Sequence, residues 1–286
     1  MKQLVVISGK GGTGKTSIVA SLAALAGNKV LADCDVDAAD LHLILDPDVQ
    51  FSEEFSGGSI AVLDKDTCIE CGKCIEVCRF GAISDKYAVS RTGCEGCSVC
   101  ARFCPADAIT MHEKISGKWF ISNTRFGPLI HAKLGIAEDN SGKLVSRVKD
   151  EAKKAAEADN LSLMIIDGSP GIGCPVIASI AGASLVLIVT EPTVSGLHDM
   201  ERVAELTGHF KIRTCVCINK YDLNSDITRK TEEFCNANNI PVVGKIPYDA
   251  EITKAQIAAQ SIIEYAPENP AAREIMSMWE SLEKKL

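Results

Sequence analysis

A glycine-rich segment between an apolar stretch and a helical stretch is the feature that most constrains this chain. The segment reads Gly9-Lys10-Gly11-Gly12-Thr13-Gly14-Lys15-Thr16. Lys2–Ser8, which precedes it, predicts a buried strand, and Thr16–Ala26 predicts a helix rich in Ala and Leu. Glycines let backbone N–H groups point at phosphate oxygens, and the helix N-terminus adds its positive end. The segment therefore predicts a nucleotide phosphate site, in which Lys15 contacts the β and γ phosphates and Thr16 binds Mg²⁺.

Strand and helix patterns alternate along most of the chain. Apolar runs predict further strands at Lys29–Ala32, Leu161–Asp167, Ser184–Thr190, Thr214–Asn219 and Val242–Pro247, and Ser141–Ala158 predicts a helix. Ser, Glu and Gly cluster at Phe51–Ser59, which predicts a linker. The alternation predicts an α/β fold whose parallel sheet is covered by helices on both faces.

Eight of the cysteines form two quartets with one spacing, C-x2-C-x2-C-x3-C, which is that of bacterial ferredoxins with two [4Fe–4S] clusters. The first quartet is Cys68, Cys71, Cys74 and Cys78, and the second is Cys94, Cys97, Cys100 and Cys104. The segment Cys78–Ile83 corresponds to Cys104–Ile109, which indicates an internal duplication. From Trp119 the α/β pattern returns. We therefore predict a small α+β ferredoxin-like domain at residues 55–115, inserted into an ATPase domain made of residues 1–54 and 116–286.

In two-cluster ferredoxins each cluster takes its fourth ligand from the other quartet. This predicts one cluster held by Cys68, Cys71, Cys74 and Cys104, and a second held by Cys94, Cys97, Cys100 and Cys78. Zinc remains the alternative, because C-x2-C pairs also bind zinc. Arg79 stands where a proline usually follows the fourth cysteine. We expect this change to alter the turn without removing a ligand.

Composition and charge narrow the classes of partner and location. The 286 residues carry a net charge of −8, which disfavours nucleic acid as the main partner. Eight of the 13 cysteines have metal spacing beside a phosphate loop, which indicates a reducing compartment and bound iron. The sequence has no run of 18 apolar residues and no signal-peptide layout at its start. We therefore expect a cytoplasmic protein without stable membrane insertion.

The second lysine of the loop, Lys10, carries a family resemblance. K-G-G-x-G-K-T is similar to the deviant phosphate loop of the MinD/Mrp class of P-loop ATPases, which includes the nitrogenase iron protein. Over essentially its whole length the chain resembles members of this class that contain an inserted two-[4Fe–4S] ferredoxin domain. The resemblance implies ATP or ADP and Mg²⁺ as ligands, slow hydrolysis, and an ATP-bound homodimer in which Lys10 reaches the partner's nucleotide.

The same resemblance implies roles for residues that follow the predicted strands. Asp35 would position the attacking water, and Asp33 and Asp167 would lie on the Mg²⁺ side. Asn219, followed by Lys220-Tyr221-Asp222, would contact the base, or belong to an ordinary loop. The loop Pro247-Tyr248-Asp249 would also line the base site.

Other polar and sulfur-bearing residues are expected to be structural. We expect Cys34, Cys174, Cys215 and Cys217 to be buried, His131 to be a core histidine, and the stripe Ile275, Trp279, Leu282 and Leu286 to pack on the core. The segments Thr124–His131 and Glu138–Lys143 are the alternative candidates for a docking or redox site. Within the second, Asp139 or Asn140 is expected to cap the helix that follows.

Three functions are compatible with these motifs. The first is electron transfer through two clusters, gated by nucleotide and directed to an unidentified redox or iron–sulfur client protein. The second is iron–sulfur cluster assembly or carriage. The third is a MinD/ParA-like positioning ATPase whose clusters are structural or sensory. Eight ligands within one module favour the first, because such clusters are held firmly.

Overall fold

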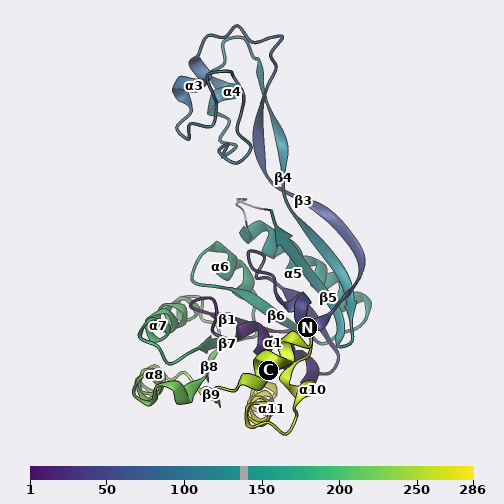
Figure 1. Cartoon of the computed structure of the whole chain (residues 1–286), viewed down its shortest axis with the longest axis vertical. Coiled ribbons are helices and arrows are strands. Elements are labelled where there is room, and N and C mark those ends of the chain that lie inside the picture. Colours follow the sequence, from purple (N-terminus) through teal and green to yellow (C-terminus); the bar gives the residue numbers. More distant parts are fainter. Residues whose placement is uncertain (136–140) are drawn as a thin grey trace. The chain divides into compact units, whose positions relative to one another are not determined.

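The chain divides into two compact units in a computed structural model that describes residues 1–135 and 141–286. The first unit comprises Met1–Ser52, Trp119–Lys133 and Ser141–Leu286. The second comprises Glu53–Lys118 and a short segment that begins at Leu134. The predicted boundaries at residues 55 and 115 lie close to these divisions. Figure 1 follows the chain through both units.

The first unit is built on a sheet with the strand order β3-β4-β5-β2-β6-β1-β7-β8-β9. Strand β1 pairs in parallel with β6 and β7, and β2 pairs in parallel with β5 and β6. Strands β2 and β7 are buried at every residue and mostly apolar, as expected for parallel strands covered on both faces. The strands are β1 (Lys2–Ser8), β2 (Lys29–Asp33), β3 (Asp48–Leu63), β4 (Ile109–Thr124), β5 (Gly127–Leu134), β6 (Leu163–Pro170), β7 (Leu185–Thr190), β8 (Thr214–Asn219) and β9 (Val242–Ile246).

The predicted parallel sheet is mixed at one edge. The turn Arg125-Phe126 joins β4 directly to β5, and so short a connection requires antiparallel strands. The predicted linker Phe51–Ser59 was wrong, because these residues lie within β3. Phe51 packs against Trp119 of β4 at 5.3 Å between ring centroids. Strands β3 and β4 each contribute residues to both units.

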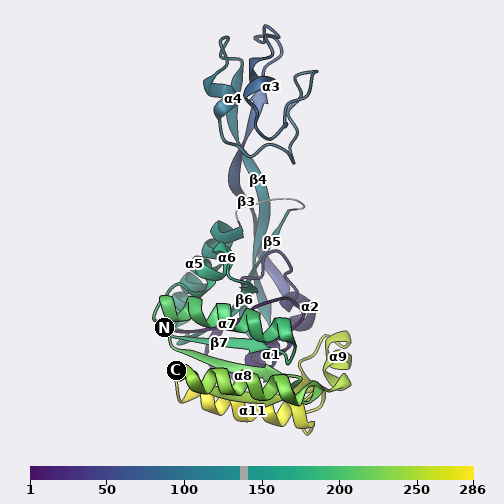
Figure 2. The ribbon, with the colours of Figure 1, turned by 90° about the vertical axis from the view of Figure 1, so that its left-hand side faces the viewer.

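Helices pack on the sheet of the first unit (Figures 1 and 2). One group of contacts joins α1, α10 and α11, and another joins α5 to α6, α6 to β6, and α7 to β7 and α8. The helices are α1 (Lys15–Leu25), α2 (Leu41–Leu45), α5 (Ser141–Ala158), α6 (Cys174–Ile180), α7 (Val194–His209), η1 (Tyr221–Leu223), α8 (Ser225–Ala237), α9 (Ala250–Ile257), α10 (Ile262–Tyr265) and α11 (Pro270–Glu283).

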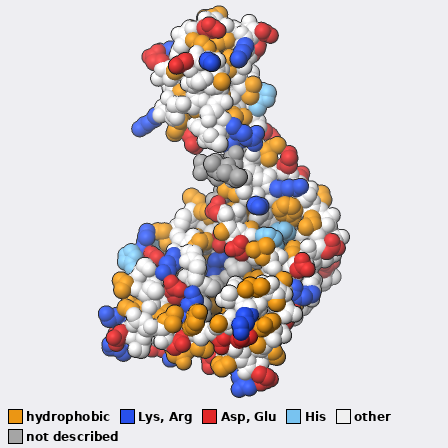
Figure 3. Space-filling model, in the orientation of Figure 1, with side chains coloured by type: hydrophobic (Ala, Val, Ile, Leu, Met, Phe, Trp, Pro, Cys, Tyr) orange, Lys and Arg blue, Asp and Glu red, His pale blue; other side chains and the backbone are white. Residues whose placement is uncertain are grey.

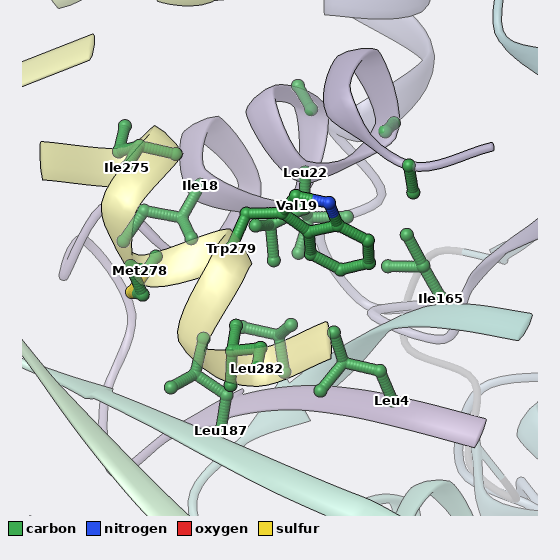
Figure 4. Close-up of a cluster of buried hydrophobic side chains, with 14 of the residues drawn as sticks. Leu4, Ile18, Val19, Leu22, Ile165, Leu187, Ile275, Met278, Trp279 and Leu282 are labelled. Carbon is green, nitrogen blue, oxygen red and sulfur yellow. The ribbon is translucent and has the colours of Figure 1, made fainter. Parts of the chain in front are cut away.

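The C-terminal helix belongs to the main hydrophobic core, as predicted. Ile275, Trp279 and Leu282 of α11 are buried and face Leu4 of β1 and Leu22 of α1 (Figure 4). Leu286 packs against the same cluster. Within the described residues, no helix is long and apolar enough to cross a membrane. Acidic and basic side chains are interspersed on the face shown in Figure 3.

The second unit contains little regular structure besides parts of β3 and β4. Its helices are the short α3 (Lys73–Val77) and α4 (Val99–Arg102), and an isolated antiparallel bridge joins Ile83 to Val89. Its small core contains Ala61, Ile83 and Ile109 together with two cysteines, Cys74 and Cys100. With so small an apolar core, this unit is of the kind that needs a further crosslink for stability.

Candidate functional site

The glycine-rich loop lies where β1 ends and α1 begins, as its sequence predicted. Gly12 and Gly14 have φ values of 81° and 88°, a region that residues with a side chain rarely adopt. The loop opens into a cavity of about 630 Å³, a size typical of small-ligand sites. The predicted residues on its lining are Gly11, Gly12, Thr13, Gly14, Lys15, Thr16, Asp35, Asn219, Pro247, Tyr248 and Asp249. Gly9, Lys10, Asp33 and Asp167 do not line it.

Lys15 is buried at the centre of a carboxylate cluster. Its Nζ contacts Asp167 Oδ1 and lies 3.2 Å from Asp35 Oδ2. Burial opposes the charge of Lys15, but the attraction of Asp167 and Asp35 prevails and raises its pKa. Burial also raises the pKa of Asp35, with Lys15 acting against that rise. The lysine is therefore held as a cation between two acidic groups.

Asp33 shapes the loop after β2. Its Oδ1 accepts a hydrogen bond from the backbone N–H of Asp35 at 3.1 Å, and its Oδ2 accepts one from Leu41 at 3.3 Å. The side chain is fully buried. Burial and the nearby Asp167 raise its pKa well above the ordinary value. Asp33 thus connects the loop to the first residue of α2.

Three buried oxygens near the phosphate loop lack a hydrogen-bond partner. They are Thr13 Oγ1, Asp35 Oδ1 and Asp167 Oδ2. Buried polar atoms without partners are rare and indicate a missing water, ion or ligand. No group of three or more His, Cys, Asp or Glu side chains among the described residues is arranged to hold a metal ion. Mg²⁺ does not require one, because it is commonly held by one or two protein oxygens, phosphates and water.

Lys10 makes its contacts at the start of α7 of its own chain. Its Nζ lies 2.8 Å from Glu191 Oε1 and donates to Thr193 Oγ1 and Ser195 Oγ at 3.2 and 3.1 Å. Glu191 also pairs with Lys220 at 3.2 Å. Burial opposes the charge of Glu191, but both lysines outweigh it and lower its pKa. Sequence reasoning missed Glu191, although it follows β7 directly, at the edge where parallel strands present their functional residues.

The predicted base contacts have structural tasks of their own. Asn219 Nδ2 donates to Thr13 O at 2.8 Å and so holds the phosphate loop. Asp249 caps α9 by accepting from Glu251 N, and it also accepts from Asn269 Nδ2, both at 2.8 Å. Tyr248 is exposed, and its N–H donates to Asp222 Oδ1 at 2.7 Å.

The eight quartet cysteines lie around two separate small cavities of the second unit. Cys68, Cys71, Cys74 and Cys104 line one cavity. Cys78, Cys94, Cys97 and Cys100 line the other. Each cavity thus takes one cysteine from the opposite quartet, which is the grouping derived from the sequence. The free space in the two cavities is about 10 and 20 Å³, on the scale of one water molecule.

Backbone donors point at the sulfurs that the quartets exchange. The N–H of Ala82 donates to Cys78 Sγ at 3.4 Å, and the N–H of Ala108 donates to Cys104 Sγ at 3.3 Å. The equal spacing of the two pairs reflects the duplication. Burial raises the pKa of Cys74 and Cys100, and their neighbouring cysteines act in the same direction. The sulfurs of the described residues are not arranged as a metal site. Four cysteines around each cavity, with N–H···S hydrogen bonds, are nevertheless the kind of ligand set that an iron–sulfur cluster uses.

The remaining predictions divide between confirmed and wrong. Cys34, Cys215 and Cys217 are buried, as predicted. Cys174, the first residue of α6, is exposed, so its predicted burial was wrong. His131 is buried and its Nε2 lies 2.9 Å from Ser122 Oγ, as expected of a core histidine. The predicted caps Asp139 and Asn140 lie outside the described residues.

Comparison with known proteins places this geometry in a family. The model of the CobQ/CobB/MinD/ParA nucleotide binding domain matches residues 4–262. An uncharacterized protein of Methanocaldococcus jannaschii is 34% identical over 99% of this chain and 96% of its own length. The cell division ATPase MinD of Pyrococcus furiosus superposes with a TM-score of 0.61 at 21% identity, covering 100% of this chain and 99% of that one.

A second solved structure has the same fold. The septum site-determining protein MinD of Pyrococcus horikoshii, solved in complex with Mg-ADP, superposes with a TM-score of 0.61 at 17% identity, covering 99% of this chain and 96% of that one. These likenesses show a MinD-like α/β P-loop fold with a mainly parallel, mixed sheet. From the family match together with the phosphate loop, the chain belongs to the CobQ/CobB/MinD/ParA family of nucleotide-binding proteins.

Proposed function

We propose that this chain is an ATP-dependent switch of the MinD/ParA kind, which binds Mg-ATP, dimerises and hydrolyses the nucleotide slowly. The observation that carries the proposal is the buried Lys15 between Asp35 and Asp167, beside a cavity of suitable size. Family and fold support this function over the other two. The other two functions, electron transfer and cluster carriage, are supported only by the cysteines around the two small cavities of the second unit.

Each residue has a distinct task in the proposed site. The N–H groups of the loop and Lys15 hold the β and γ phosphates, which draw Lys15 away from its two carboxylates. Thr16 and Asp167 hold Mg²⁺, because Asp167 Oδ2 has no other partner. Asp35 Oδ1, also without a partner, orients the attacking water. Asp33 acts through the loop, since backbone N–H groups occupy both of its oxygens.

Nucleotide binding and assembly test this proposal together. Sedimentation with a non-hydrolysable ATP analogue and Mg²⁺ is expected to show a dimer, and ADP a monomer. Asp35→Asn is expected to dimerise with ATP and to hydrolyse it about 100-fold more slowly, because only the orientation of water is lost. A wild-type chain that binds no nucleotide, or stays monomeric under saturating analogue, would contradict the proposal.

We further propose that the second unit holds two [4Fe–4S] clusters, because four cysteines surround each of its cavities. Cys68, Cys71, Cys74 and Cys104 would hold one, and Cys78, Cys94, Cys97 and Cys100 the other. Each cluster would supply a one-electron redox centre when bound. Anaerobically prepared protein is expected to contain about eight iron atoms per chain. Stoichiometric zinc instead would reject the assignment.

Double variants separate the exchanged grouping from a local one. Cys68→Ala with Cys104→Ala removes two ligands of one proposed cluster, so about four iron atoms are expected to remain. Cys68→Ala with Cys78→Ala removes one ligand from each cluster, so both are expected to be lost. If each quartet held its own cluster, the two iron contents would be reversed. The pair of variants therefore controls for a general effect of removing two cysteines.

A further inference from the structure

Arg125 makes five hydrogen bonds from one guanidinium. It lies in the turn between β4 and β5. Its Nε and Nη2 donate to the two carboxylate oxygens of Glu264, at 2.6 and 3.0 Å. Its Nη1 and Nη2 also donate to the carbonyls of Leu45 and Ile44, at 2.8 and 3.0 Å, and Nη2 donates to that of Ala259 at 2.9 Å. One guanidinium thus joins the β4–β5 turn to two other parts of the chain, α2 and the α9–α10 segment.

The segments that Arg125 joins form two walls of the nucleotide cavity. On one wall, Leu43 and Ile44 of α2 line the cavity. On the other wall, the residues that follow α9 line it, Gln260, Ser261 and Ile262. Glu264, the partner of Arg125, completes the capping box of α10 with Ser261. Arg125 therefore fixes the separation of α2 from the α9–α10 segment.

Strands β4 and β5 and the turn between them form a hairpin, and this β4–β5 hairpin contacts α2 at a second place. His42 of α2 stacks on His131 of β5 with ring centroids 6.0 Å apart. His131 stacks in turn on Phe120 of β4 at 4.8 Å. His131 is also paired with Asp33 in the register of β5 and β2. A movement of α2 would therefore change its contacts with the hairpin both at the turn, through Arg125, and along the strands, through His131.

The phosphate end of the cavity is connected to α2 through the loop after β2. Asp33 accepts a hydrogen bond from the backbone N–H of Leu41, the first residue of α2, and Asp35 in the same loop contacts Lys15. Phosphates that draw Lys15 away from Asp35 change this loop. Coupling between sites can pass through an element that shifts between two arrangements. Helix α2 contacts both this loop and the β4–β5 hairpin, so a shift of α2 would act on both.

Strand β4 continues without interruption from this hairpin to the cysteine-rich loops. It runs from Thr124, beside Arg125, to Ile109. Ile109 packs with Cys74 and Cys100 in the small core of the second unit. The residue before it, Ala108, donates its N–H to Cys104 Sγ. The backbone itself therefore connects the turn at Arg125 to the cysteine cavities.

We infer that Arg125 is a positioning residue that sets the width of the nucleotide cavity and transmits the nucleotide-dependent position of α2 to β4. The inference rests on the proposed ATP binding and adds the path by which the second unit responds. Breaking contacts along such a path changes coupling by about 2- to 30-fold in affinity. A purely structural arginine would change stability and leave the response of β4 to nucleotide intact.

Hydrogen exchange by mass spectrometry on the full chain, with and without saturating Mg-ADP, tests the inference. In the wild type, nucleotide is expected to slow exchange in the phosphate loop, in α2 and in β4. In Arg125→Met, the phosphate loop is expected to remain protected at saturation, whereas the nucleotide-dependent change in β4 is lost. The affinity for Mg-ADP is expected to fall by about 2- to 30-fold.

Two further variants keep the test decisive. Arg273→Met is the matched control, because it removes an exposed arginine of α11 that pairs with Glu268, and it is expected to behave as wild type. Glu264→Gln removes the carboxylate but leaves the carbonyl contacts of Arg125, so it reports on the path even if Arg125→Met folds poorly. Its β4 response is expected to be weakened.

The outcomes distinguish this inference from the proposed function. A β4 response that persists in Arg125→Met or is absent from the wild type, while the phosphate loop responds, overturns the inference and leaves ATP binding intact. A wild-type phosphate loop that does not respond to Mg-ADP overturns the proposed function, and the inference falls with it.

Discussion

Two lysines of one loop are held by different partners, and this difference predicts different defects. Lys15 lies buried between Asp35 and Asp167, whereas Lys10 lies at the start of α7 with Glu191. Lys15→Ala is expected to weaken ATP binding about 100-fold, because a charge-assisted contact to phosphate is lost. Lys10→Ala is expected to bind ATP normally and to fail to dimerise, because the family resemblance implies that Lys10 reaches the nucleotide of the partner in the dimer. Fluorescent-nucleotide titration and sedimentation measure the two effects, and a Lys10 variant that dimerises like wild type would contradict the trans role.

A buried histidine gives the stability a defined dependence on pH. Burial and the neighbouring His42 lower the pKa of His131 to about 4, whereas an unfolded histidine titrates near 6.5. Protonation therefore favours the unfolded chain, and the stabilisation that is complete above pH about 6.5 is lost as the pH falls toward 4. The loss is about 3 kcal/mol. Urea unfolding at pH 7 and pH 4 measures it, and His131→Gln is expected to lose that much less than wild type; equal losses would show that His131 contributes nothing.

At the scale of elements, the local sequence pattern predicted helices and strands well where one face or the whole element is buried. It predicted poorly where a strand forms only because it pairs with another strand. The helix Ser141–Ala158 and the strand Thr214–Asn219 have the predicted bounds. Strand β3 was missed, because its Ser, Glu and Gly residues are mostly exposed and its conformation follows from pairing with β4, which is distant in sequence. Likewise, the contacts of Arg125 join segments that no local motif connects.

Helix α11 allows a test of the core at this scale. Trp279 is buried against residues of β1 and α1, so Trp279→Ala is expected to lower the free energy of unfolding by about 3–5 kcal/mol. Ile257 of α9 is 82% exposed and provides the control, since Ile257→Ala is expected to change stability by less than about 0.5 kcal/mol. Denaturant unfolding measures both variants. Equal effects would mean that α11 does not pack as Figure 4 shows.

At the scale of the whole molecule, the sequence predicted which cysteines share a cavity, because duplication and spacing are properties of the chain itself. The route that we propose between the nucleotide site and those cavities uses β3 and β4, which contribute residues to both units, and α2, which touches the β4–β5 hairpin. The contacts of α2 with that hairpin join segments distant in sequence, so no local pattern predicted them. Physical continuity of this kind permits coupling, and only measurement of two ligands together establishes it.

The last prediction therefore concerns both units at once. If nucleotide and clusters are coupled, the reduction potentials of the proposed clusters differ between nucleotide-free, ADP-bound and ATP-analogue-bound protein. A coupling of about 1–3 kcal/mol is ordinary, and about 1.4 kcal/mol corresponds to roughly 60 mV for a one-electron couple. Linkage requires reduction to change ATP affinity by the same factor. Potentials that are equal in all three states, together with an ATP affinity unchanged by reduction, would reject nucleotide-gated electron transfer and leave an ATP switch whose clusters are structural or sensory.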